Sequence, residues 1–73
     1  MSRLPRISGR ECVKALEKVG FYFLRQRASH ISLCRDEPFA QVVVPDHREI
    51  AKGTLRNIIR DAGLSVDEFI ELL

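Results

Sequence analysis

The chain contains no long apolar run and only two cysteines, and each of these features argues against a class of protein. None of its apolar stretches approaches the ~20 residues that a membrane-spanning helix needs. Residues 1–9 alternate basic, apolar and turn-forming types and lack the apolar segment of a secretory signal. We therefore expect a cytoplasmic protein that does not associate with membranes.

The cysteines and other potential metal ligands do not have the number or spacing of a disulfide framework or a metal site. Cys12 and Cys34 are too few for a disulfide framework, and they fall in a predicted helix and a predicted strand, where free thiols pack as small apolar groups. A structural zinc site needs about four ligands in paired spacings, and no such spacing occurs. We expect two buried free thiols, no metal and no cofactor.

The composition itself is globular, with an uneven distribution of charge. Hydrophobic residues make up 45% and charged residues 30%, and 73 residues allow one domain, 1–73, with one modest core. Residues 1–35 contain eight Lys/Arg and two Glu, a net charge of +6, whereas residues 36–73 contain four Lys/Arg and eight Asp/Glu, a net charge of −4. This asymmetry favours a phosphate-binding surface, although solvated helix faces would give the same counts.

Capping signals and helical periodicity predict three helices. Ser8-x-x-Glu11 fits a capping box that opens the first, and Gly20 suits its end. A second helix is predicted over 51–62, and Ser65-x-x-Glu68 opens a third. Their apolar positions are Cys12, Val13, Leu16 and Val19; Leu55, Ile58, Ile59 and Ala62; and Val66, Phe69, Ile70 and Leu73.

Three strands are predicted between the first two helices, over 21–26, 29–35 and 41–45, with short turns between them. The order α-β-β-β-α-α predicts an α+β fold, with a three-stranded antiparallel sheet covered by helices on one face. In the second strand Ile31 and Leu33 alternate with His30, Ser32 and Cys34. If the aliphatic pair faces the core, His30 lies on the open face of the sheet.

The turn between the first two strands carries the residues best suited to chemistry. An unperturbed imidazole titrates near ~6.5, so His30 can act as a general base or acid. Arg25 and Arg27 suit phosphate, and Ser29 and Ser32 can orient a substrate, which together suit metal-free cleavage of RNA. The alternative is an incidental surface histidine. A Ser–His acyl-transfer pair is disfavoured, because Ser29 points to the other face and no carboxylate is at hand to orient the imidazole.

A basic stripe on the second predicted helix is the other candidate site. Lys52, Arg56 and Arg60 recur every four residues and can follow a phosphate backbone. A solvated face with local pairing, such as Glu49 with Lys52, is the alternative. We assign the aromatic residues Phe21, Tyr22, Phe23 and Phe39 largely to the core, which leaves few for base stacking. His47 is either a second proton-transfer group or a loop residue placed by chance.

Several stretches, taken in order, resemble HicA-type mRNA interferase toxins of bacterial and archaeal HicA–HicB toxin–antitoxin systems. They are Ser8-Gly9-Arg10-Glu11, Gly20-Phe21, Arg25-Gln26-Arg27-Ala28-Ser29-His30, Val44-Pro45-Asp46-His47, Lys52-Gly53-Thr54-Leu55-Arg56 and Ala62-Gly63-Leu64-Ser65. The resemblance covers almost the whole chain. It implies a fold like that of double-stranded-RNA-binding domains, in agreement with the predicted order. It also implies a type II toxin acting in stress responses, an endoribonuclease that cleaves mRNA without a metal, and a HicB-type antitoxin that covers the histidine.

The resemblance also assigns residues. The functional histidine of the family's Gly-Ser-His motif corresponds to His30, and the second-helix cations Lys52 and Arg56 correspond to phosphate-tracking residues. Ala28 stands here in place of the motif's glycine, and a turn that needs positive φ at this position would be strained by alanine. Two other functions remain open on the residues alone: a non-catalytic RNA-binding module that uses the basic stripe, and a protein-interaction domain without affinity for RNA.

Overall fold

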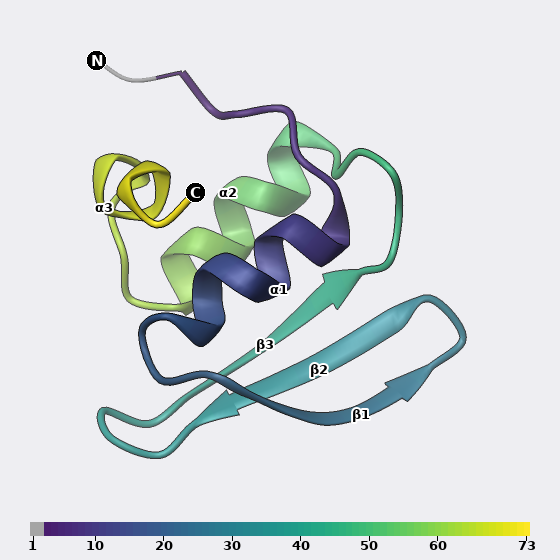
Figure 1. Cartoon of the computed structure of the whole chain (residues 1–73), viewed down its shortest axis with the longest axis vertical. Coiled ribbons are helices and arrows are strands. Elements are labelled where there is room, and N and C mark those ends of the chain that lie inside the picture. The colour runs from purple at the N-terminus through teal and green to yellow at the C-terminus, as the bar shows by residue number, and fades with distance from the viewer. Residues whose placement is uncertain (1–2) are drawn as a thin grey trace.

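The computed structural model describes residues 3–73 and has the predicted order of elements (Figure 1). The three strands form one antiparallel sheet in the order β1-β2-β3, so the predicted α+β fold resembling double-stranded-RNA-binding domains is confirmed. No helix within residues 3–73 is long and apolar enough to span a membrane. The elements are α1 (Gly9–Glu17), β1 (Tyr22–Arg27), β2 (His30–Arg35), β3 (Ala40–Pro45), α2 (Lys52–Asp61) and α3 (Val66–Glu71).

Both predicted capping boxes are present. The Ser8 hydroxyl accepts a hydrogen bond from the Glu11 amide at 3.1 Å, and the Glu11 carboxylate accepts one from the Ser8 amide at 2.9 Å. The same pair of bonds joins Ser65 and Glu68, at 3.1 and 2.8 Å. Each cap satisfies amide groups that the first helical turn leaves without partners, which stabilises a helix by about 1 kcal/mol. In contrast, α2 begins after Ala51 without a side-chain cap.

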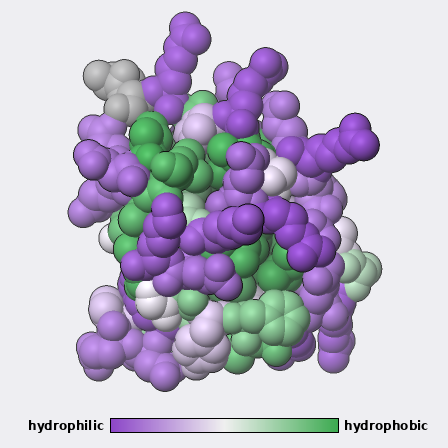
Figure 2. Space-filling view, viewed as in Figure 1, coloured by the Kyte–Doolittle hydropathy of each residue, from purple (hydrophilic) through white to green (hydrophobic). Residues whose placement is uncertain are grey.

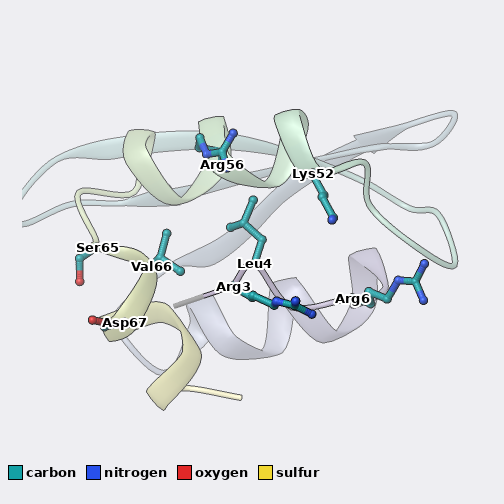
Figure 3. Close-up of a pocket in the computed structure, with 8 residues that line it drawn as sticks. All are labelled: Arg3, Leu4, Arg6, Lys52, Arg56, Ser65, Val66 and Asp67. Atoms are coloured by element: carbon teal, nitrogen blue, oxygen red, sulfur yellow. The ribbon is translucent and has the colours of Figure 1, made fainter. Parts of the chain in front are cut away.

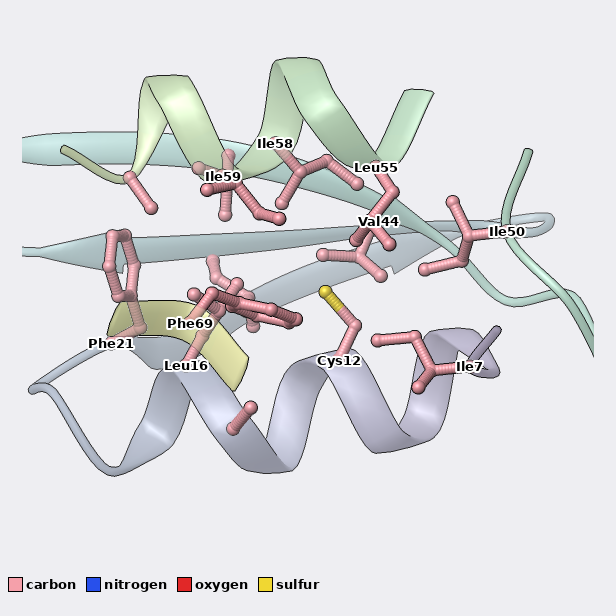
Figure 4. Close-up of a cluster of buried hydrophobic side chains, with 14 of the residues drawn as sticks. Ile7, Cys12, Leu16, Phe21, Val44, Ile50, Leu55, Ile58, Ile59 and Phe69 are labelled. Atoms are coloured by element: carbon pink, nitrogen blue, oxygen red, sulfur yellow. The ribbon is translucent and has the colours of Figure 1, made fainter. Parts of the chain in front are cut away.

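The core lies between the helices and one face of the sheet (Figure 4). All four predicted apolar positions of α2 are buried, and Leu16, Leu33 and Phe69 are fully enclosed. Cys12 belongs to this cluster, and burial raises the pKa of its thiol to about 12. Burial of each leucine, isoleucine or phenylalanine side chain in this core contributes roughly 1.5–3 kcal/mol to the stability of the fold. The predicted burial of Cys12 and Cys34 as free thiols is confirmed. Leu73 of the predicted third apolar face is 49% exposed.

Strand β1 extends beyond the helices, and this overturns the expectation for the aromatic residues. The helices contact mainly β3, so β1, at the opposite edge of the sheet, is exposed along its whole length. Phe21 is buried as expected, but Tyr22, Phe23 and Phe39 are 42%, 55% and 69% exposed. The assignment of these three to the core was wrong. The helices do not cover β1, which carries Phe23, Tyr22 points to the other face of the sheet, and Phe39 lies in the turn before β3. Apolar side chains accordingly reach the surface over the sheet (Figure 2).

Arg35, the last residue of β2, links the strand to the end of α2. Its guanidinium lies 4.7 Å from the centre of the Phe21 ring, and it donates hydrogen bonds to the carbonyls of Pro38 at 2.8 Å and Ala62 at 3.1 Å. The second bond satisfies a carbonyl at the end of α2. One cation of the basic half of the chain is thus occupied in holding the fold together.

Candidate functional site

His30 is the first residue of β2 and follows directly on the turn between β1 and β2. Ile31 and Leu33 are buried in the core whereas His30 is exposed and Ser32 is half-buried, as the predicted alternation requires. Cys34, predicted on the face of His30, is nevertheless buried, opposite Tyr22 of β1. Across the sheet His30 is paired with Arg27 of β1 on one side and with Pro45 of β3 on the other. The imidazole therefore stands on the face of the sheet away from the core.

A bulge in β1 decides which side chains share that face with His30. Between Phe23 and Arg25 the register shifts by one residue, so that Leu24 is the extra residue. Arg25 is then paired with Ser32, and Arg27 with His30. Directly opposed residues of neighbouring strands point to the same side of a sheet. The bulge thus keeps Tyr22, three residues before Arg25, on the same face as both arginines.

This outer sheet face, which we define by Tyr22, Arg25, Arg27, His30, Ser32 and Val43, combines charge, hydroxyl and apolar surface. Within residues 3–73, neither arginine of the face forms an ion pair with a carboxylate. The Tyr22 hydroxyl donates a hydrogen bond to Asp36 at 2.7 Å, which raises the pKa of Tyr22. A shallow hollow of about 120 Å³ beside the bulge is lined by residues that include Leu24, Arg25, Ser32 and Val43.

The turn itself has the conformation that the motif's glycine suggested. Ala28 and Ser29 form a two-residue loop, and Ala28 has φ +50°, the one positive value at a non-glycine residue within 3–73. Positive φ at the first central position is characteristic of hairpin turns in which glycine is preferred. An alanine in a left-handed conformation costs roughly 1–2 kcal/mol, so surrounding contacts must hold the turn.

Those contacts converge on Asp46, which follows the last residue of β3. Its carboxylate accepts two hydrogen bonds from the Arg10 guanidinium, from Nε at 3.1 Å and from Nη2 at 2.9 Å. The Gln26 side-chain amide donates to the same carboxylate at 3.3 Å and to the Ala28 carbonyl at 3.1 Å. The Asp46 backbone amide donates to the Ser29 carbonyl at 2.6 Å. We call these contacts the Arg10–Asp46 network; its hydrogen bond from Arg10 lowers the pKa of Asp46 and raises that of Arg10.

The end of β3 is also attached closely to the start of α1. The Gly9 amide donates to the His47 carbonyl at 2.9 Å, and a Cβ atom at Gly9 would overlap the Pro45 carbonyl oxygen. Only glycine allows this approach. The network therefore connects a well-anchored helix to the hairpin that carries His30.

The structure places Lys52 and Arg56 elsewhere, around an open hollow of about 910 Å³ between α2, α3 and the N-terminal segment (Figure 3). In that view the strands pass behind the helices, and no strand residue lines the hollow. We call it the basic hollow. Its lining residues are Arg3, Leu4, Arg6, Lys52, Arg56, Ser65, Val66 and Asp67.

The pairing of charges on α2 differs from the expectation. Glu49 pairs with Arg6 at 3.6 Å, not with Lys52. Arg60 lies 3.6 Å from Asp61 and does not line the basic hollow, so the predicted three-residue stripe is divided. Within the described residues Lys52 and Arg56 form no ion pair with a carboxylate.

The predicted site residues thus fall into two groups. Arg25, Arg27, His30 and Ser32 come together on the outer sheet face, with Ser29 in the adjoining turn, while Lys52 and Arg56 belong to the basic hollow. Sequence reasoning gave no role to Arg10, Gln26 or Asp46. Among residues 3–73, no group of three or more histidine, cysteine or carboxylate side chains is placed to hold a metal ion.

Residues 9–64 match the model of a protein family described as "HicA toxin of bacterial toxin-antitoxin". The match begins at the first residue of α1, includes all three strands and α2, and ends before α3. No curated protein matches the chain.

Proposed function

The chain belongs to the HicA family of toxins of bacterial toxin–antitoxin systems, and on this premise we propose that it is an endoribonuclease that cleaves messenger RNA without a metal ion. The observation that carries the proposal is the outer sheet face. His30 stands there, directly paired with Arg27 and two residues from Ser32, and neither Arg25 nor Arg27 is engaged in an ion pair within residues 3–73.

The chemistry needs a proton acceptor beside cations. The His30 imidazole takes the proton of a ribose 2′-hydroxyl, whose oxygen attacks the adjacent phosphorus. The bond from phosphorus to the 5′-oxygen breaks, leaving a 2′,3′-cyclic phosphate on one fragment. The 5′-oxygen of the other fragment receives a proton, either from the imidazolium of His30 or from water.

The arginines stabilise the charge that builds on the phosphoryl oxygens during attack. Opposed residues in an antiparallel pair have Cβ atoms about 4.5–5.5 Å apart, so the guanidinium of Arg27 is within reach of a phosphate contacted by His30. Arg25, opposite Ser32, lies farther along the same face and suits the next phosphate. Ser29 and Ser32 supply hydroxyls that orient the sugar and phosphate.

The basic hollow supplies affinity in this proposal. Lys52 and Arg56 bind backbone phosphates at a distance from the bond that breaks, and such contacts carry no sequence information. The hollow also favours a second candidate function, a non-catalytic RNA-binding module. That alternative predicts binding that depends on Lys52 and Arg56 and no cleavage that depends on His30.

Membership of the family implies a cognate antitoxin. We propose that it is of the HicB type and covers the outer sheet face. The exposed Tyr22 and Val43 flank the proposed catalytic residues there and offer apolar surface for such a contact.

Cleavage of RNA in the presence of EDTA tests the proposal, with the wild-type protein compared with His30→Ala. We expect wild type to cut and His30→Ala to bind RNA without cutting it. His47→Ala is the companion variant: it removes the protein's other histidine, also exposed, and a loss of cleavage there would identify the second proton-transfer group. Cleavage abolished by EDTA would contradict the metal-independent mechanism, and unchanged cleavage by His30→Ala would favour the binding module or a different base.

A further inference from the structure

We propose that Asp46 is a positioning residue which, through Arg10 and Gln26, fixes the β1–β2 turn and so holds His30 in its place for catalysis. This inference rests on the proposed function, because it assigns a task to residues that do not touch the substrate. It gives a role to the hydrogen bonds that join Arg10, Gln26 and Asp46 beside the turn.

The contacts of Asp46 reach both carbonyls of the turn. Its own amide holds the Ser29 carbonyl at 2.6 Å, and its carboxylate holds the Gln26 amide, which in turn donates to the Ala28 carbonyl at 3.1 Å. Both central residues of the loop are thereby tied to the end of β3. Arg10 fixes the carboxylate with two bonds in the planar fork geometry that favours a single orientation.

Apart from the backbone pairing of β2 with its two neighbouring strands, few contacts among the described residues hold the hairpin at this end. Every side chain of β1 is exposed, so packing against the core does not fix the strand that leads into the turn. Ala28 has the positive φ that alanine disfavours, so a turn without these bonds is free to relax. In contrast, the other end of the network is rigid, since α1 is capped by Ser8 and closely joined to β3 at Gly9.

His30 is adjacent to the network on two sides. It follows Ser29 in the chain, and across the sheet it is paired with Pro45, the residue before Asp46. A shift of the turn is therefore passed directly to the backbone that carries the imidazole. A displacement of ~1 Å in a reacting group lowers the rate by about 10²-fold.

A purely structural role for the ion pair makes a different prediction. The side chain of Arg10 is 69% exposed and that of Asp46 24% exposed, and pairs of this kind contribute little to stability. If the network served only the fold, its loss would lower the stability slightly and leave the turnover of the folded protein unchanged. Catalytic turnover and turn order are the quantities that separate the two roles.

The first experiment measures kcat and KM for cleavage of an unstructured RNA by wild type, Asp46→Ala, Asp46→Asn and Arg10→Ala. We expect kcat to fall about 10- to 100-fold in Asp46→Ala and Arg10→Ala, and less in Asp46→Asn, which keeps one acceptor oxygen. KM stays within about twofold, because no phosphate contact is removed. Arg10→Ala in the Asp46→Ala background should add little further loss, since the two residues act as a unit.

The matched control is Asp61→Asn, which removes the exposed pair between Arg60 and Asp61 on α2. It should leave kcat and KM unchanged. A kcat for folded Asp46→Ala within twofold of wild type would overturn the proposal, and so would a raised KM at constant kcat. If Asp46→Ala does not fold, the same criteria apply to Asp46→Asn.

A second measurement needs no RNA. Backbone NMR order parameters of residues 28–30 should be near ~0.85 in wild type and in Asp61→Asn, and should fall toward ~0.6 in Asp46→Ala. Unchanged order in the variant would overturn the positioning role even if activity were lost. If wild type cleaves no RNA, the proposed function fails, and the order parameters still decide whether Asp46 fixes the turn.

Discussion

The outer sheet face and the basic hollow both present cations that form no ion pair with a carboxylate among residues 3–73, among them Arg25 and Arg27 on the face and Lys52 and Arg56 in the hollow, yet their surroundings differ. On the sheet face, Arg25 and Arg27 are in register with Ser32 and His30, beside a turn held by hydrogen bonds. In the basic hollow, Lys52 and Arg56 lie on the α2 side of Leu4 and Val66 (Figure 3), and no histidine lines the hollow.

From this difference we infer that the outer sheet face performs the chemistry and that the basic hollow contributes affinity for RNA. Transition-state stabilisation needs groups fixed at the reacting atoms, whereas attraction of a phosphate backbone needs only charge. Both regions carry cations, a serine and apolar side chains, so what distinguishes the outer sheet face is His30 and the strand register that places it beside Arg27. We therefore expect variants of the sheet face to lower kcat and variants of the hollow to raise KM.

Removal of Arg27 should have the largest effect of a change outside His30 itself. Loss of one fixed donor to developing charge costs about 10²–10³-fold in kcat. We expect a loss of this size for Arg27→Ala and a smaller one for Arg25→Ala, which is paired with Ser32 instead of His30. Single-turnover cleavage at saturating protein measures it. Lys14→Ala, which removes an exposed cation of α1, is the control, and an equal loss there would show that the effect does not depend on the position of Arg27 beside His30.

The double substitution Lys52→Ala/Arg56→Ala should raise KM about tenfold and leave kcat within about twofold, because two phosphate contacts are lost without change at the reacting atoms. The slope of log affinity against log salt should fall by about 1.4, at ~0.7 per phosphate contact on single strands. Filter binding at several salt concentrations measures it. Arg60→Ala, on the same helix but outside the hollow, should change neither value. A loss in kcat matching that of Arg27→Ala would show that the two regions form one site.

Ala28→Gly should stabilise the fold without changing turnover. Relief of the positive φ gains more than the added freedom of the unfolded chain costs, leaving a net increase of about 0.5–1 kcal/mol in the free energy of unfolding. Denaturant unfolding measures it. The turn already has the required conformation, so kcat should stay within about twofold. A large rise in kcat would instead show that alanine distorts the site.

The smallest effect concerns the pH dependence of stability. Arg10 lowers the pKa of Asp46 in the folded protein, so the contribution of the carboxylate is present above the unfolded value of 3.8. It is lost as the pH falls through the lower, native pKa. Asp46→Asn should therefore be less stable than wild type at neutral pH, and the difference should disappear in acid. Glu11, whose pKa is also lowered, is common to both proteins and cancels in the comparison. A difference in stability that is constant across the pH range would contradict a stabilising contribution from the ion pair between Arg10 and Asp46.

Local signals predicted most of the fold. Ser8 and Ser65 open helices because their capping partners lie three residues away, and the apolar face of α2 follows from spacing within a few turns. The exposed position of His30 followed from alternation with Ile31 and Leu33. These features depend on neighbours in the chain, so the sequence contains their causes.

The arrangement of the site depends on distant parts of the chain and was not predictable in the same way. Arg10 and Asp46 are 36 positions apart, and nothing local pairs them. The residue types of β1 do not predict the bulge at Leu24, although the bulge determines which residues share a face with His30. The helices' preference for β3 exposes Phe23, which reasoning from hydrophobicity had placed in the core.

Single-turnover cleavage by His30→Ala, with RNA saturated by protein so that affinity does not enter the rate, measures whether the outer sheet face performs the chemistry. If the sheet face performs the chemistry, the rate should fall by at least about 10²-fold, the typical contribution of a general base, while Lys52→Ala/Arg56→Ala retains the wild-type rate. The cut fragments from wild type should end in a 2′,3′-cyclic phosphate. A His30→Ala protein that cleaves at the wild-type rate would contradict the account.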